Sequence, residues 1–94
     1  MALHTRKSWR MFFEDIYAGI RTSDIRSEDR GQFHEDDELH LREWDPVKGT
    51  YTGREMICLI TYVQRNKSNP CAISSDALKE GYCVLSIRPL GIIQ

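Results

Sequence analysis

Residues 55–63 restrict the fold most, because Glu-Met-Ile-Cys-Leu-Ile-Thr-Tyr-Val is the most β-prone run in the chain. Residues 38–44 alternate polar and apolar side chains, which is typical of a half-buried strand with its two leucines facing the core. Between these runs, residues 45–49 begin with Asp-Pro and end in glycine, as turns do. The pattern predicts a long β-hairpin over residues 38–63.

Residues 9–18 form the longest stretch with helical periodicity. Ser8 is the expected N-cap, and Gly19 is the expected stop because glycine enters the left-handed conformation without steric cost. We expect both phenylalanines of this stretch to lie in the core. The apolar side chains at positions i, i+3, i+4, i+7 and i+8 make one face, formed by Trp9, Phe12, Phe13, Ile16 and Tyr17.

Three further strands are expected, over residues 3–8, 22–26 and 82–88, the last ending at Pro89. Residues 74–80 have room for a short helical turn. This order predicts an α+β fold, a small, mixed, mostly antiparallel β-barrel of about five strands whose main helix closes one opening. A chain of 94 residues is expected to form a single domain, residues 1–94, with one modest core.

Composition narrows the functional classes. The net charge of −1 gives no overall positive field for nucleic acid, although residues 48–94 hold six basic and three acidic side chains, so one face could be basic. An odd count of three cysteines without metal-ligand spacing argues against a disulfide framework, and we expect no metal and no cofactor. No apolar segment is long enough for a signal peptide or a membrane span, so we expect a cytoplasmic protein, and we also expect a monomer.

Charged side chains are concentrated in residues 19–30, after the expected helix. On a strand, Asp24 and Arg26 would share one face with Thr22 beside them, and Ile25 would point into the core. Arginine could bind phosphate there, and Asp24 could bind a base edge or a ribose hydroxyl. The alternative is a structural network of ion pairs that braces the corner between helix and strand.

Other candidates lie outside this segment. Lys7, on the expected first strand, should border the cleft in which residues 19–30 would bind a ligand. Tyr51 and Arg54 flank a glycine and could form a stacking platform, or a simple turn with an aromatic lid. The acidic residues 35–38 are expected to form a solvated loop. We assign no catalytic residue, and the predicted ligand-binding residues are Lys7, Arg21, Thr22, Asp24, Arg26, Asp29, Arg30, Tyr51 and Arg54.

An ordered set of short motifs extends along the chain: His4, Lys7, Phe12-Phe13, Gly19, Arg21-Thr22, Asp24, Arg26, Asp29-Arg30, Asp36-Asp37, Leu41-Arg42-Glu43-Trp44-Asp45, Tyr51-Thr52-Gly53-Arg54, Ile60-Thr61-Tyr62 and Gly81-Tyr82-Cys83-Val84-Leu85. With these motifs the whole chain resembles the ASCH family within the PUA-like superfamily. The resemblance is strongest to a small uncharacterised subgroup from bacteria and their phages.

This resemblance implies binding of RNA or modified nucleosides in a cleft beside the barrel. In the acetylcytidine amidohydrolase relatives a lysine, a threonine and a distal glutamate carry out the chemistry. Arg21 stands here for the lysine and Asp24 for the threonine, and the glutamate has no evident partner. Arginine stays protonated and cannot serve as a base, so the exchange argues against lysine-dependent hydrolysis and leaves ligand binding intact. The loop glycine of the subgroup is Asp36 here.

The sequence therefore predicts an RNA- or nucleotide-binding module with an arginine-lined cleft. Two alternatives stay open. One is a nucleic-acid hydrolase, either a ribonuclease or a modified-nucleoside amidohydrolase. The other is a phage or bacterial factor that binds a protein partner.

Overall fold

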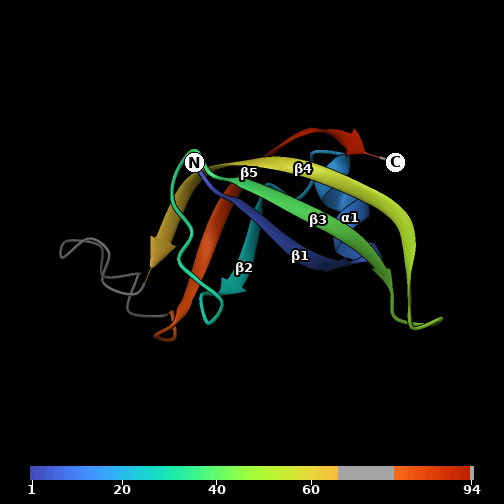
Figure 1. Ribbon diagram of the computed structural model, residues 1–94, viewed down its shortest axis with the longest axis horizontal. Coiled ribbons are helices and arrows are strands. Elements are labelled where there is room, and N and C mark those ends of the chain that lie inside the picture. Colours follow the sequence, from blue (N-terminus) through green and yellow to red (C-terminus); the bar gives the residue numbers. More distant parts are fainter. Residues whose placement is uncertain (66–77, 94) are drawn as a thin grey trace.

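The computed structural model describes residues 1–65 and 78–93. A five-stranded sheet in the order β1-β3-β4-β5-β2 curls into a half-barrel, with β1 parallel to β3 and the other neighbours antiparallel (Figure 1). The expected barrel-like α+β architecture and the β3–β4 hairpin are thus confirmed. The elements are β1 (Leu3–Trp9), α1 (Arg10–Tyr17), β2 (Ser23–Ser27), β3 (Glu38–Asp45), β4 (Thr50–Arg65) and β5 (Tyr82–Ile93).

The curl comes from the two longest strands. β4 and β5 arch across the top of the molecule in Figure 1, and α1 lies beneath one end of the arch. Their pairing shifts register between Ile57 and Cys58 and again between Ile60 and Tyr62, and such irregularities bend a strand and increase its twist. The expected strand end at Pro89 is wrong, because β5 continues to Ile93. Pro89 faces Cys58 at the first shift, where a residue without an N–H is tolerated.

Helix α1 contacts β1, β3 and β5, and it buries only Phe13 and Ile16. The expected apolar face is therefore buried only in part, and the expectation that Phe12 lies in the core is wrong. Trp9, Phe12 and Tyr17 are partly exposed, because a helix of two turns at the end of the half-barrel presents only a narrow stripe to the core. The expected Ser8 cap is also wrong, since Ser8 is still in β1 and Trp9 occupies the N-cap position without a side-chain hydrogen bond.

Other local expectations hold. Gly19 follows the helix with a φ of 78°, as its role as a stop requires. Burial raises the pKa of the Cys58 thiol to about 12 and that of Cys83 to about 11, as for cysteines that behave as small apolar residues. Cys71 and most of the helical turn expected over 74–80 lie outside the described residues. The core consists of Phe13, Ile16, Phe33, Leu39, Leu41, Met56, Cys58, Ile60, Val63, Cys83, Leu85 and Ile87.

The expectation of a solvated acidic loop at 35–38 is wrong for Asp37, whereas Glu35, Asp36 and Glu38 are exposed. Asp37 is only 3% exposed, and its carboxylate accepts hydrogen bonds from the backbone N–H groups of Ala2 (2.9 Å) and His34 (3.1 Å). His4 Nε2 lies 2.8 Å from the same carboxylate. Burial alone would raise the pKa of Asp37, but these hydrogen bonds lower it to about 2. Asp37 therefore ties the start of β1 to the loop before β3.

The described residues contain no helix with the length and hydropathy needed to cross a bilayer.

The two adjacent phenylalanines of α1 provide a test of this packing. Phe13→Ala should lower the free energy of unfolding by about 3–5 kcal/mol, because Phe13 is fully buried. Phe12→Ala should cost about 1 kcal/mol, because its ring is 38% exposed. Urea unfolding of the two variants measures the difference, and equal losses would contradict the assigned orientation of the helix.

Asp37 provides a test of pH dependence. A carboxyl whose folded pKa is lowered adds stability above its unfolded pKa, and that stability disappears as the pH falls toward the folded value of about 2. Asp37→Asn should therefore be less stable than the wild type by roughly 2 kcal/mol near neutral pH, and the gap should narrow between about pH 4 and pH 2. Thermal melts at several pH values measure this gap, with the exposed Asp29→Asn as control. A gap that does not change with pH would contradict the prediction.

Candidate functional site

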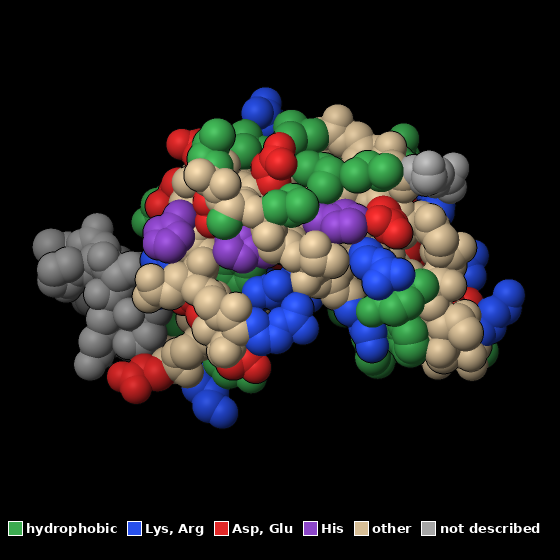
Figure 2. All heavy atoms as spheres, in the orientation of Figure 1, with side chains coloured by type: hydrophobic (Ala, Val, Ile, Leu, Met, Phe, Trp, Pro, Cys, Tyr) green, Lys and Arg blue, Asp and Glu red, His purple; other side chains and the backbone are tan. Residues whose placement is uncertain are grey.

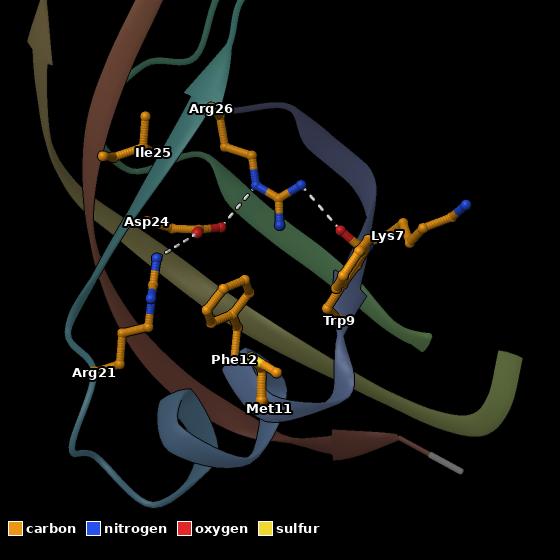
Figure 3. A pocket seen from close by; sticks show the side chains of 8 residues that line it. All are labelled: Lys7, Trp9, Met11, Phe12, Arg21, Asp24, Ile25 and Arg26. Atoms are coloured by element: carbon orange, nitrogen blue, oxygen red, sulfur yellow. Dashed lines mark hydrogen bonds and ion pairs between the residues drawn. The ribbon is translucent and has the colours of Figure 1, made fainter. Parts of the chain in front are cut away.

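A hollow of about 540 Å³ opens where α1 meets strands β1 and β2 (Figure 3). This volume is in the range of pockets that hold small ligands. Its polar side chains come mostly from β2 and the residues before it, and most of its apolar surface comes from the end of β1 and the start of α1. The lining residues are Lys7, Trp9, Met11, Phe12, Arg21, Asp24, Ile25 and Arg26.

Asp24 occupies the centre of the charged wall and is only 6% exposed. Its Oδ2 accepts a hydrogen bond of 2.7 Å from Arg26 Nε, and its Oδ1 accepts a longer one of 3.4 Å from Arg21 Nη2. Figure 3 shows the carboxylate between the two guanidinium groups. Asp24 therefore orients both arginines, so part of the predicted ion-pair network is real and lies in the wall of a hollow.

The orientation of strand β2 is the reverse of the one expected, because Ile25 points to solvent and Asp24 points inward. Asp24 and Arg26 share one face, as expected, but Ile25 is 60% exposed and does not enter the core. The inward positions of β2 pair with Leu85 and Cys83 of β5, so Asp24 and Arg26 point to the interior side. Polar groups are tolerated there because β2 is an edge strand, whose inward side borders the hollow.

Arg26 and Arg21 have further contacts. Arg26 Nη1 donates a hydrogen bond of 3.0 Å to the Lys7 backbone carbonyl, which links β2 to β1 at the opposite edge of the sheet. Arg21 Nε donates to the Ser23 carbonyl at 3.0 Å, and its guanidinium lies 4.4 Å from the centroid of the Phe12 ring. Phe12 was predicted to be core, and its partial exposure instead gives Arg21 an aromatic support.

Lys7 lines the hollow, but in Figure 3 its backbone carbonyl faces Arg26 and its side chain extends away from the other lining residues. Lys7 Nζ lies 3.8 Å from the ring centroid of Trp44, which projects from the neighbouring strand β3. This geometry is a cation–π contact. Lys7 therefore connects the hollow to an aromatic group on the outer face of the sheet.

Three other predicted residues lie outside the lining of the hollow. Arg30 is close to it, since its Nη2 donates a hydrogen bond of 3.0 Å to the Thr5 carbonyl of β1. Asp29 is exposed in the following turn. Thr22 is exposed as well, and its backbone carbonyl accepts a hydrogen bond of 2.9 Å from the Ile87 N–H.

Sequence reasoning missed Arg6. It lies on the inward face of β1, with Nη1 donating to the Thr5 carbonyl at 2.9 Å. Its Nη2 is buried and has no hydrogen-bond partner among the described residues. Burial lowers the pKa of Arg6, and the nearby positive charges of Arg30 and Arg26 lower it further. The alternation of β1 was the available signal, because Arg6 shares its parity with the buried Ser8.

Tyr51 and Arg54 are not part of this hollow, and both line a second one of about 510 Å³. Arg54 Nη2 lies 2.9 Å from the buried carboxylate of Glu43 and also contacts Glu14 of α1. The hydrogen bonds from Arg54 lower the pKa of Glu43, although burial acts in the opposite direction. Arg54 therefore braces α1 against β3 and β4, which favours a structural role over ligand contact.

Tyr51 packs against its neighbours on the sheet. Its ring centroid lies 5.0 Å from that of Trp44 in an edge-on arrangement, and the Arg42 guanidinium lies 3.9 Å from the Tyr51 centroid. Of the two readings for this turn, the aromatic lid fits these contacts better than an open stacking platform. Within residues 1–65 and 78–93, no cluster of three or more His, Cys, Asp or Glu side chains could hold a metal ion.

The fold and the hollow define a class: a small α+β half-barrel domain with an arginine-lined hollow between its two edge strands. The chain belongs to the family described as "Domain of unknown function (DUF3850)", whose model matches residues 3–87. No curated protein matches the chain.

The structural role of Arg54 in the second hollow can be tested by mutation. Arg54→Met should lower the free energy of unfolding by about 3 kcal/mol, because it leaves the Glu43 carboxylate buried without its partner. The matched control is Arg88→Met, at an exposed position of β5, which should change stability by less than about 0.5 kcal/mol. Urea unfolding measures both, and a stable Arg54→Met variant would rule out the bracing role.

Proposed function

We propose that this chain is an RNA- or nucleotide-binding module that uses the hollow between β1, α1 and β2. The observation that carries the proposal is the buried Asp24 carboxylate holding the guanidiniums of Arg21 and Arg26 in the wall of an open hollow. Guanidinium groups bind phosphate through paired N–H donors and stack on bases. A preoriented pair of them beside aromatic side chains fits a nucleotide better than it fits an apolar ligand.

The apolar part of the hollow supports the same proposal. Trp9 and Phe12 are partly exposed rings that line it, and Met11 and Ile25 add apolar surface. A base has an apolar face and a polar edge, so it can stack on such rings while its edge or the ribose reaches a carboxylate. Asp24 is the carboxylate in reach of that position.

Binding is proposed in preference to hydrolysis. Each oxygen of Asp24 accepts one hydrogen bond from a guanidinium group and keeps a further acceptor position, which suits a hydrogen bond from a base edge or a ribose hydroxyl. Arg21, which stands for the lysine of the hydrolytic relatives, remains protonated and cannot act as a base. We further propose that the chain is a PUA-like domain of the ASCH kind, for which a half-barrel with a cleft at its side is the expected architecture.

The near-neutral net charge of the chain predicts a modest affinity for RNA and a weak dependence of that affinity on salt. We expect two or three phosphate contacts, so the logarithm of the affinity should fall with the logarithm of salt concentration with a slope of only about −1.4 to −2.1 for single-stranded RNA.

The test is a chemical-shift titration of isotope-labelled protein with short RNAs and with the four ribonucleoside 5′-monophosphates. Shifts are expected in residues 21–26 and in the Trp9 indole. Asp24→Asn removes the charge that orients the two arginines, and it should weaken binding about tenfold, or roughly 1.4 kcal/mol. Arg88→Met, at an exposed position of β5 that does not line the hollow, is the control and should leave affinity unchanged. Absence of shifts near residues 21–30 at millimolar ligand would end the proposal.

A further inference from the structure

Three guanidinium groups meet at the free edge of β1. Arg6 Nη1 and Arg30 Nη2 both donate to the Thr5 carbonyl, at 2.9 and 3.0 Å, and Arg26 Nη1 donates to the Lys7 carbonyl at 3.0 Å. Thr5 and Lys7 are two residues apart on one strand, so their carbonyls point to the same side, roughly 7 Å from each other. The three positive groups, called here the Arg6–Arg26–Arg30 cluster, therefore lie along one short stretch of this edge, where donors on either side of a phosphate group could reach its oxygens.

The positive charge of this cluster is only partly balanced. Arg26 pairs with Asp24, but in the described part of the chain neither Arg6 nor Arg30 forms an ion pair with a carboxylate. Asp29 is close enough to favour the charged form of Arg6, whereas burial and the neighbouring arginines oppose it. Figure 2 shows basic side chains gathered beside the notch on the underside of the molecule. An anion bound there would offset the mutual repulsion.

Two polar atoms on the same face of β1 are also without partners. Arg6 Nη2 and Ser8 Oγ are buried, and neither has a hydrogen bond within the described residues. They belong to successive inward positions of the strand, and the whole Ser8 side chain is only 2% exposed. A buried donor without an acceptor is costly, so an acceptor oxygen brought next to Arg6 Nη2 would relieve that cost.

We propose that the Arg6–Arg26–Arg30 cluster binds the phosphate of a nucleoside monophosphate unit, whose base and ribose occupy the adjoining hollow. This inference rests on the proposed function. It assigns the phosphate to the cluster, and the base and ribose to the hollow. Arg26 belongs to both regions, since it lines the hollow and also reaches the edge of β1. Three fork-shaped donors suit a tetrahedral anion with several acceptor oxygens better than they suit a single carboxylate.

The experiment compares each ribonucleoside with its 5′-monophosphate and with inorganic phosphate, by titration of labelled wild-type protein and three variants. The 5′-monophosphate should bind at least tenfold more tightly than the nucleoside. Arg6→Gln and Arg30→Gln should each remove most of that advantage without changing nucleoside affinity. Arg88→Gln, which removes one exposed charge of β5 outside the hollow, should leave all affinities as in the wild type.

Inorganic phosphate separates this inference from the proposed function. Phosphate should shift the side-chain Nε–H signals of Arg6 and Arg30 in the wild type, even if no nucleoside binds, and it should leave the Arg30 signal unshifted in the Arg6→Gln variant. If nucleotides bind in the hollow but the Arg6→Gln and Arg30→Gln variants keep wild-type affinity, the inference is wrong and the proposed function stands. Because Arg30 is exposed, Arg30→Gln gives a decisive result even if Arg6→Gln fails to fold.

Discussion

The structure depends on how its two edge strands are held together. β1 and β2 lie at opposite ends of the sheet order, and no backbone ladder joins them in the described residues. Instead, Arg26 and Arg30 reach from β2 and the turn after it to the carbonyls of Lys7 and Thr5. Side chains thus satisfy an edge that would otherwise be free to pair with another chain, and they keep the sheet curled. The hollow exists because this closure is made by long side chains, which leave space between the strands.

Local patterns in the sequence were sufficient for the elements that depend on near neighbours. The β3–β4 hairpin, the stop at Gly19 and the shared face of Asp24 and Arg26 all follow from periodicity or turn chemistry, and all three are correct. The orientation of Ile25 and the exposure of Phe12 were wrong for a common reason. Alternation tells which residues share a face, but which face meets the core depends on where an edge strand or short helix sits in the closed fold.

Polar residues were the harder part of the prediction. Acidic residues in the loop before β3 suggested solvation, yet Asp37 is buried. Its carboxylate has one hydrogen-bond partner nearby in the sequence, His34, and two that are distant, Ala2 and His4. Arg6 and Arg54 have the same side chain, but one meets other arginines and the other meets carboxylates, and neither neighbourhood is visible in the composition. For Asp36 the resemblance was informative. The subgroup has a glycine at this position, and Asp36 has a φ of 71°, a conformation that glycine adopts freely.

The structural and ligand-binding readings of the arginines are compatible because of the number of donors each carries. A guanidinium has five N–H groups. Within the described residues, Arg30 uses one nitrogen to hold the Thr5 carbonyl, and Arg26 uses two, for Asp24 and Lys7. The donors that close the half-barrel are therefore different from those left for a phosphate. A ligand can bind without breaking the closure, and it would add acceptors where the protein itself supplies too few. The same groups that hold the edges of the sheet together can thus form one wall of a binding site.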